Sequence, residues 1–227
     1  MARKVLVVLT NHGKYPNLNR ATGVWFGEAV HFVKQVEQAG LQVDYVSPQG
    51  GYVPIDPHSL EAADETDWEW YARRDFVNHM GATKKASDVR ADAYAAIYFV
   101  GGHGVMWDFP NNVDLQRLTR DIWEKGGVVS AVCHGVVGLL NVKLSDGKAM
   151  IDGKRLTGFS NEEEALVQLD KQVPFLTESA LRERGAHYEK APEAWAPFAV
   201  VDGRLVTGQN PASSAKVGQF VVEALKK

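Results

Sequence analysis

The sequence predicts an α/β fold, a three-layer sandwich in which helices cover both faces of a mostly parallel sheet. Short apolar runs alternate with amphipathic segments along the 227 residues, which is typical of α/β domains. The first apolar run is continuous, as in strands that are buried on both faces of a sheet. Parallel strands need crossover connections, and the amphipathic segments supply them. Because no repeat or linker interrupts the pattern, we expect one domain over residues 1–227.

The N-terminal part of the chain predicts a strand, a helix and a second strand. Residues 4–10, KVLVVLT, are the continuous apolar run, and residues 41–47, LQVDYVS, are the next strand. Between them, apolar side chains recur at helical spacing at Phe26, Val30, Val33 and Val36. Gly40 then provides a helix stop, because glycine readily adopts the left-handed conformation in which many helices end.

Residues 48–90 interrupt this rhythm. The turn-forming stretch PQGGYVPIDP is followed by SLEAADETDWEWYARRDFVNHM, which is acidic and aromatic and favours helix. We interpret the segment as a small helical insertion that covers the sheet. It lies either over the functional site or on the surface without a catalytic part, and the residues alone leave both alternatives open.

After the insertion the alternation resumes. Residues 94–100 and 128–132 are predicted strands, and residues 114–127 form an amphipathic helix between them that ends at glycine. This second strand–helix–strand unit repeats the order of the first. It therefore supports a sheet that is built from parallel crossovers.

The C-terminal part predicts a hairpin and a closing helix. Residues 201–208 form the hairpin, which turns through Asp202 and Gly203. Asn210 is a typical N-cap residue and Pro211 suits the first helical position, so the rest of the chain is expected to be helical.

Composition excludes several classes of function. The formal net charge is −3 at pH 7 and no Lys/Arg block stands out, so a nucleic-acid partner is not expected. No apolar run is long enough for a secretory core or a membrane span. A single cysteine excludes an internal disulfide framework, and the seven histidines lack HxxxH and HxH spacing, so no metal site is predicted. We expect a cytoplasmic protein without a nucleic-acid or membrane partner.

The cysteine, Cys133, stands where a predicted strand meets a predicted helix. In AVCHG it has small residues two positions away on each side, Ala131 and Gly135, which is the thiol counterpart of a serine nucleophile elbow. A helix N-terminus favours thiolate over thiol, and its free N–H groups can hold an oxyanion. Lone cysteines commonly pack as small apolar groups. The adjacent His134 and the position at the carboxyl end of a parallel strand favour a nucleophile here.

A thiol nucleophile needs a base and an acid that orients the base. His134 follows directly and supplies the imidazole. The stretch TGFSNEEEALV offers Glu162, Glu163 and Glu164, although glutamates in a first helical turn also complement the helix dipole. Glu28 lies among apolar neighbours, where a half-buried carboxyl would have a raised pKa and could hydrogen-bond the thiol. By spacing alone, a solvated helix position describes Glu28 better.

The loop VGGHG ends the strand of residues 94–100. Its glycines allow a close backbone approach to a ligand, and its successive N–H groups can bind an anion. The G-x-G-x-x-G spacing of dinucleotide sites is absent. His103 is either a substrate contact or a turn histidine with a structural hydrogen bond. Residues 186–189, AHYE, have the His–Glu spacing of glutamine-amidotransferase triads but lack their surrounding motif, so we assign no site there.

Five motifs in order, spread over nearly the whole chain, give the sequence a family resemblance. The motifs AVCHG, FVGGHG with WDFPNN, TGFSNEEE, VDGRLVTGQNPASS and SPQGGYVPIDPHS together resemble the PfpI superfamily. More narrowly, they resemble its glyoxalase III-like, heat-shock-inducible branch. The resemblance implies a flavodoxin-like sandwich and a homodimer. Large members of the branch carry a metal site beside the cleft, but no ligands for it can be placed in this sequence.

The resemblance also implies roles for individual residues. The family acid stands six residues after the position of Gly158, which matches Glu164 better than the neighbouring Glu163. The backbone of the partner histidine is a second donor to the oxyanion. The expected set is the nucleophile Cys133, its partner His134, the acid Glu164, the thiol-contacting Glu28, the oxyanion glycine Gly102, and His103 and Gly135 toward the substrate.

The chemistry that the resemblance implies needs no cofactor and no glutathione. Cys133 adds as a thiolate to the aldehyde of a small 2-oxoaldehyde such as methylglyoxal. His134 or Glu28 then moves a proton from the former aldehyde carbon to its neighbour through an enediolate. Water releases a 2-hydroxy acid, which is D-lactate for methylglyoxal.

Two other classes of function fit the same residues. An elbow thiol with a histidine and a carboxylate suits acyl transfer, so a cysteine peptidase, an amidase or a protein deglycase is one alternative. The other is not an enzyme but a stress chaperone or an oxidation sensor, because a reactive Cys133 is readily oxidised.

Overall fold

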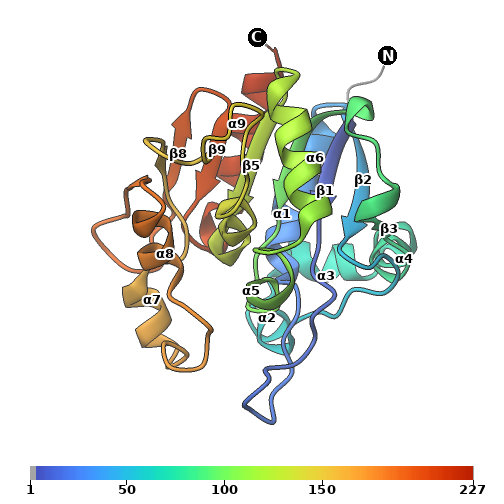
Figure 1. The fold of residues 1–227 in the computed structure, drawn as a ribbon. Coiled ribbons are helices and arrows are strands. Elements are labelled where there is room, and N and C mark those ends of the chain that lie inside the picture. Colours follow the sequence, from blue (N-terminus) through green and yellow to red (C-terminus); the bar gives the residue numbers. More distant parts are fainter. Residues whose placement is uncertain (1–3, 227) are drawn as a thin grey trace.

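A computed structural model of the chain describes residues 4–226 and has a seven-stranded sheet between two layers of helices (Figure 1). The strand order is β3-β2-β1-β4-β5-β9-β8. Neighbouring strands are parallel except for the β8–β9 pair at one edge. The predicted three-layer α/β sandwich with a mostly parallel sheet is confirmed.

The elements alternate along the chain as the apolar pattern predicted. The strands of the main sheet are β1 (Lys4–Val8), β2 (Gln42–Ser47), β3 (Lys84–Lys85), β4 (Tyr94–Phe99), β5 (Val128–Val132), β8 (Ala199–Asp202) and β9 (Leu205–Gly208). A second, two-stranded sheet consists of β6 (Arg155–Leu156) and β7 (His187–Tyr188). The helices are α1 (Phe26–Gln38), α2 (Pro57–Glu61), α3 (Glu65–Tyr71), α4 (Arg74–Gly81), α5 (Val105–Asp108), α6 (Val113–Glu124), α7 (Asn161–Leu166), α8 (Thr177–Glu183) and α9 (Ser214–Lys226).

Each face of the sheet has its own hydrophobic core. Val5 and Val7 of β1 point to the side of α1 and α9, whereas Leu6 and Val8 point to the side of α6. Successive strand side chains face opposite ways, so a continuous apolar run is required wherever both faces are covered. Figure 1 shows α1 and α9 behind the sheet and α6 in front of it. Among residues 4–226, no helix combines the length and apolar character that crossing a membrane requires.

The predicted ends of the elements need small corrections. Gly40 has a φ of +76°, so the helix stop is confirmed. The predicted hairpin is also confirmed, because β8 and β9 pair antiparallel around Gly203. Asn210 caps a short 3-10 turn, Pro211–Ser213, and α9 begins only after it. Lys227, the end of the predicted closing helix, lies outside the described residues.

The insertion, residues 48–90, is more divided than the sequence predicted. It holds three short helices, α2, α3 and α4, and the edge strand β3, which pairs with β2. A capping box between Asp64 and Asp67 begins α3, because each side chain accepts a hydrogen bond from the other's backbone N–H. The segment therefore extends the sheet as well as packing against α1. Its function as a cover of the site stays a prediction.

The carboxyl ends of the parallel strands lie together at the bottom of Figure 1. The loop after β4 leads into α5, and β5 leads directly into a 3-10 helix, Cys133–Leu139. This edge is where open α/β sheets hold ligands, and the chain's only cysteine lies on it.

Candidate active site

Cys133 lies on a sharp turn directly after β5. Its φ is +56°, a left-handed conformation that non-glycine residues rarely adopt and that costs about 1–2 kcal/mol. The strained backbone is held by its neighbours, since the carbonyl of Cys133 accepts a hydrogen bond from the N–H of Phe159 at 3.2 Å. Strain of this kind is concentrated at functional sites. The turn therefore has the geometry of a nucleophile elbow.

His134 links the thiol to a carboxylate. Its Nδ1 lies 3.4 Å from Sγ of Cys133, and its Nε2 lies 2.6 Å from Oε2 of Glu164. All three side chains are buried. The imidazole thus stands between a thiol and an acid, in the order that nucleophilic catalysis requires.

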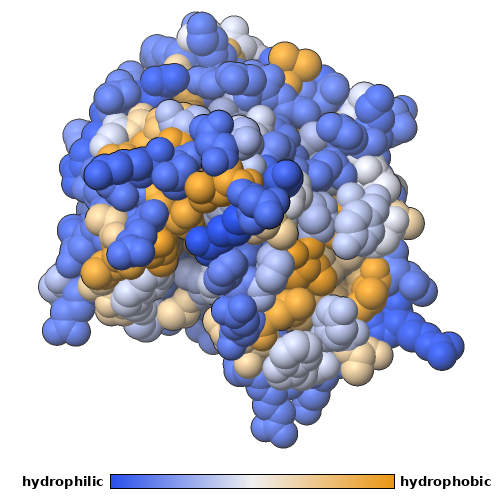
Figure 2. Space-filling model, turned by 90° about the horizontal axis from the view of Figure 1, so that it is seen from below, coloured by the Kyte–Doolittle hydropathy of each residue, from blue (hydrophilic) through white to orange (hydrophobic). Residues whose placement is uncertain are grey.

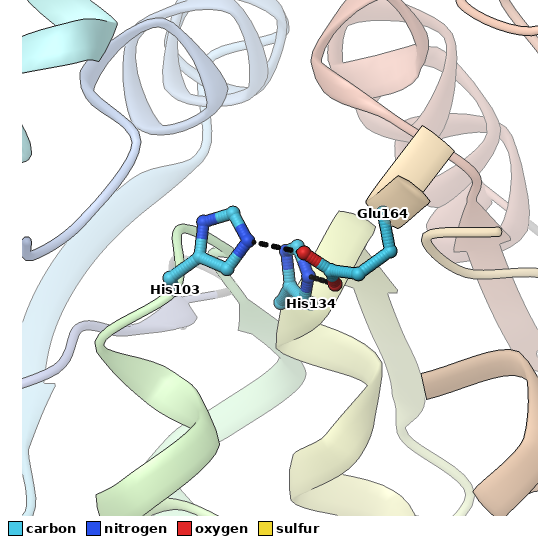
Figure 3. Close-up of side chains that lie close together, drawn as sticks. All are labelled: His103, His134 and Glu164. Carbon is cyan, nitrogen blue, oxygen red and sulfur yellow. Dashed lines mark hydrogen bonds and ion pairs between the residues drawn. The ribbon is translucent and has the colours of Figure 1, made fainter. Parts of the chain in front are cut away.

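A second imidazole binds the other oxygen of the same carboxylate. Nε2 of His103 lies 2.7 Å from Oε1 of Glu164, and the rings of His103 and His134 are 4.1 Å apart (Figure 3). The two histidines hold the pKa of Glu164 well below its usual range, although burial acts in the opposite direction. Burial, together with the neighbouring His134, lowers the pKa of His103. Glu164 is therefore an anion that orients both rings.

The three glutamates of TGFSNEEEALV have three different environments. Glu162 is on the outside, where it pairs with Lys190 at 2.7 Å. Glu163 is buried and accepts from Ser160, from the N–H of Trp195 at 3.0 Å and from Asn210 Nδ2 at 2.8 Å. Glu164 alone of the three contacts the histidines. Of the three glutamates that the residue pattern left open, Glu164 is therefore the one placed to orient His134.

Glu28 is entirely buried at the first turn of α1, beside the thiol. Its Oε2 accepts a hydrogen bond from the N–H of Gly101 at 2.7 Å, whereas Oε1 makes none to the described residues. Burial raises the pKa of Glu28 to about 8, while interaction with the Cys133 side chain lowers it in part. At neutral pH the carboxyl is therefore protonated and able to donate to sulfur. The solvated position favoured by spacing alone is wrong.

The thiol does not show the lowered pKa that its place before a helix predicted. Burial raises the pKa of Cys133, and a charged Glu28 raises it further, while the N–H of His134 opposes the shift. The helix that follows is a 3-10 helix of seven residues rather than a long α-helix. Burial and a charged Glu28 therefore both favour the thiol form of Cys133.

The two glycines assigned to the site have different surroundings. Gly102 has a φ of +97°, lines the cavity and has no room for a Cβ, which would collide with the carbonyl of Gly23. Gly135 does not line the cavity. A Cβ there would collide with the carbonyl of Phe99 at the end of β4. Gly135 therefore packs closely against β4 beneath the elbow, and its expected place next to the substrate stays a prediction.

A cavity of about 250 Å³ opens above the thiol. Gly102, His103, Cys133 and His134 lie on it. The remaining lining residues are Trp25, Phe159, Val167, Trp195, Asn210, Pro211 and Ala212. None of this second set was predicted from the sequence, because no motif distinguishes a cavity wall from ordinary core aromatics. Figure 2 views this end of the molecule and shows hydrophobic areas among hydrophilic ones.

Two groups of His and carboxylate side chains have ligand atoms close enough together to hold a metal ion. In the first, Glu164 hydrogen-bonds His103 at 2.7 Å and His134 at 2.6 Å, so these donor atoms already have partners within the protein. In the second, His31 forms ion pairs with Asp64 and Asp67, which also form the capping box of α3. Neither arrangement requires a metal. The prediction of a site without metal stays a prediction.

Comparison with known proteins places the chain in a family. The model of the DJ-1/PfpI family matches residues 21–224. The chain belongs to the DJ-1/PfpI family. Among its DJ-1/PfpI relatives, glutathione-independent glyoxalase HSP31 of Saccharomyces cerevisiae is 34% identical, over 99% of this chain and 98% of the relative. Glyoxalase 3 of Candida albicans is 33% identical over 98% of each chain.

Solved structures of the DJ-1/PfpI family superpose closely. Rapid Encystment Protein 24 KDa of Francisella tularensis has a TM-score of 0.94 and 39% identity, covering 98% of this chain and 99% of its own. Glyoxalase III of Candida albicans has a TM-score of 0.91 and 33% identity, covering 98% and 97%. The flavodoxin-like prediction is thereby confirmed.

Proposed function

We propose that this chain is a glutathione-independent glyoxalase, a lyase that converts 2-oxoaldehydes such as methylglyoxal to 2-hydroxy acids without a cofactor. The proposal rests on the linear array of Cys133, His134 and Glu164, with a neutral Glu28 beside the thiol. Similarity to relatives that are named glutathione-independent glyoxalases supports it.

The first step is addition of sulfur to the aldehyde. Nδ1 of His134, 3.4 Å from Sγ, accepts the thiol proton, and ionised Glu164 stabilises the resulting imidazolium. The thiolate attacks the aldehyde carbon, and the new oxyanion takes the proton from His134 to give a hemithioacetal. The N–H groups of Gly102 and His134 are the donors proposed for that oxyanion.

The second step is an internal redox rearrangement. Neutral His134 removes the hydrogen on the sulfur-bearing carbon as a proton, and the electron pair moves toward the ketone to give an enediolate. A proton returns to the former ketone carbon, either from His134 or from Glu28, which His134 then reprotonates. The hydroxyl proton on the sulfur-bearing carbon passes to the former ketone oxygen, which leaves a 2-hydroxyacyl thioester. Water hydrolyses the thioester, which releases the 2-hydroxy acid and restores the thiol.

The decisive experiment is to follow D-lactate formation from methylglyoxal without added glutathione or metal. The native protein should form lactate, and the Cys133→Ala protein should form none. A folded protein with a reduced thiol that produced no lactate would overturn the proposal. Peptide, amide and glycated amino acid substrates are assayed in parallel, because faster turnover of those compounds would place the protein among the hydrolases.

The homodimer and the cytoplasmic compartment belong to the same proposal. A reducing compartment suits a catalytic thiol, which must not be oxidised. The described residues of one chain already bring Cys133, His134 and Glu164 together, and the homodimer is proposed from the family resemblance.

A further inference from the structure

The cavity above Cys133 has more room than methylglyoxal requires. Its volume is about 250 Å³, whereas an apolar protein cavity of about 150 Å³ is enough to hold benzene. Methylglyoxal carries only a methyl group beside its two carbonyls. The two carbonyl carbons of a 2-oxoaldehyde have to meet the thiol and the oxyanion donors on the cavity wall. The substituent on the ketone carbon must therefore occupy the rest of the cavity.

Charged side chains are absent from the walls of this space. Among the described residues, those that line the cavity include no Lys, Arg, Asp or Glu. Asn210 donates both amide N–H groups, to Glu163 and to the carbonyl of Ala196, and its Oδ1 accepts from Ser213. Its polar atoms are therefore committed to the protein. A charged or strongly polar substituent would lose its hydration here without a matching partner.

Aromatic rings extend outward from the reacting atoms. The ring of Phe159 lies 4.3 Å from that of His134 on one side and 5.7 Å from that of Trp195 on the other. Trp195 holds its place at the rim with a φ of +67° and an N–H donated to Glu163 at 3.0 Å. The backbone at this position is thus fixed by a buried carboxylate, while Trp195 itself is 44% exposed and open to a ligand. Offset or edge contacts with such rings favour aromatic ligands.

We propose that the preferred substrates are 2-oxoaldehydes with an aromatic or bulky apolar substituent, of which phenylglyoxal is the simplest probe. This inference rests on the proposed glyoxalase function. Phenylglyoxal and water give mandelate: the aldehyde carbon is oxidised to the carboxylate, and the ketone carbon is reduced to the alcohol. No external oxidant or reductant takes part. The phenyl ring occupies the space between Phe159, Trp195 and Trp25.

The test compares kcat/KM for phenylglyoxal and methylglyoxal, with mandelate and lactate quantified directly by chromatography. We expect kcat/KM for phenylglyoxal to be at least about tenfold higher, mainly through a lower KM, since one methylene in an apolar pocket already gives about tenfold or more. A value equal to or below that for methylglyoxal would overturn this inference and leave the glyoxalase proposal intact. If neither compound is turned over, the glyoxalase proposal itself fails, and this inference fails with it.

Variants of the lining residues test whether the cavity wall causes the preference for phenylglyoxal over methylglyoxal. Trp195→Ala should lower the ratio of the two kcat/KM values about tenfold, through the KM for phenylglyoxal. Trp68→Ala is the matched control, because Trp68 is an exposed tryptophan of α3 that does not line the cavity. If Trp195→Ala fails to fold by circular dichroism, Ala212→Phe gives the same test by filling the rim. An unchanged ratio in a folded variant would contradict the assignment of the aromatic wall.

A charged analogue of phenylglyoxal shows whether the cavity selects its substrate by polarity as well as by shape. 4-Carboxyphenylglyoxal has the same ring with an added negative charge, and no Lys or Arg lines the cavity among the described residues. Its kcat/KM should fall at least about tenfold below that of phenylglyoxal. Equal turnover of the two compounds would mean that the ring lies outside the cavity, and would overturn the inference.

Discussion

At the scale of single residues, Glu164 joins two imidazoles to one carboxylate. Glu164→Gln removes the charge that stabilises a protonated His134, so we expect kcat for methylglyoxal to fall at least about a hundredfold. Glu162→Gln is the matched control on the same helical turn, because the half-exposed Glu162 pairs with the exposed Lys190 and does not line the cavity. Steady-state kinetics of both variants check this, and equal losses in the two would show that helix α7 rather than the carboxylate is responsible.

Glu28 makes the free energy of unfolding fall as pH rises, which is opposite to the usual effect of a carboxyl group in a folded protein. Its pKa is raised from 4.5 to about 8 in the folded chain, so the folded state binds more protons than the unfolded state between those values. Stability therefore falls as pH rises through this window. We expect the free energy of unfolding of the native protein, relative to Glu28→Gln, to fall by a few kcal/mol between pH 4.5 and 8.

Urea denaturation of the native protein and Glu28→Gln across this pH range measures the difference. Subtracting one curve from the other removes the titration of groups that the two proteins share. Curves that stay parallel would contradict the prediction, because they would mean that Glu28 titrates alike in the folded and unfolded chain.

At the scale of elements, the turn between β5 and its 3-10 helix stores strain in one residue. Glycine usually destabilises regular structure relative to alanine by about 0.5–1 kcal/mol. At Cys133 the φ of +56° should offset or reverse that order, since only glycine adopts it without strain. We therefore expect Cys133→Gly to be at least as stable as Cys133→Ala in chemical denaturation, although both are inactive. A clearly more stable alanine variant would contradict a strained elbow.

The elements differ in how well the sequence predicted them. The strand β5 is buried on both faces and the helix α6 on one face, and each kind of burial has its own spacing of apolar residues. The sequence therefore predicted both elements directly. The insertion was predicted only as helical. Its division into α2, α3 and α4 depends on local caps, such as the one at Asp64, that a single acidic stretch does not distinguish.

At the scale of the whole molecule, the site depends on the order of the strands in the sheet, which the spacing of residues along the chain does not predict. Cys133 and His134 were predicted because they are neighbours in a recognisable turn. Glu28 and Glu164 reach them only because β1, β4 and β5 are adjacent and parallel, which brings α1 and α7 to the same edge. Family resemblance, not spacing, selected both glutamates. The apolar wall of the cavity had no sequence signal of its own.

Assembly is the remaining prediction at this scale. We expect a homodimer, with a sedimentation mass near twice the 25.0 kDa of one chain. Analytical ultracentrifugation at micromolar concentration checks this. A monomeric protein that retains full activity would refute the dimer and leave the proposed chemistry unaffected.

Glu163 has a consequence for how such a site can change over evolutionary time. Its carboxylate ties the start of α7, the rim tryptophan Trp195 and Asn210 together, and the next residue is Glu164. The position of the rim residues and the orientation of the His134 imidazole are therefore linked through one peptide bond. We expect mutations that reshape the rim by removing the contacts of Glu163 to disturb Glu164 as well. New specificities should therefore arise through Trp25 or Ala212, which line the cavity without making those contacts.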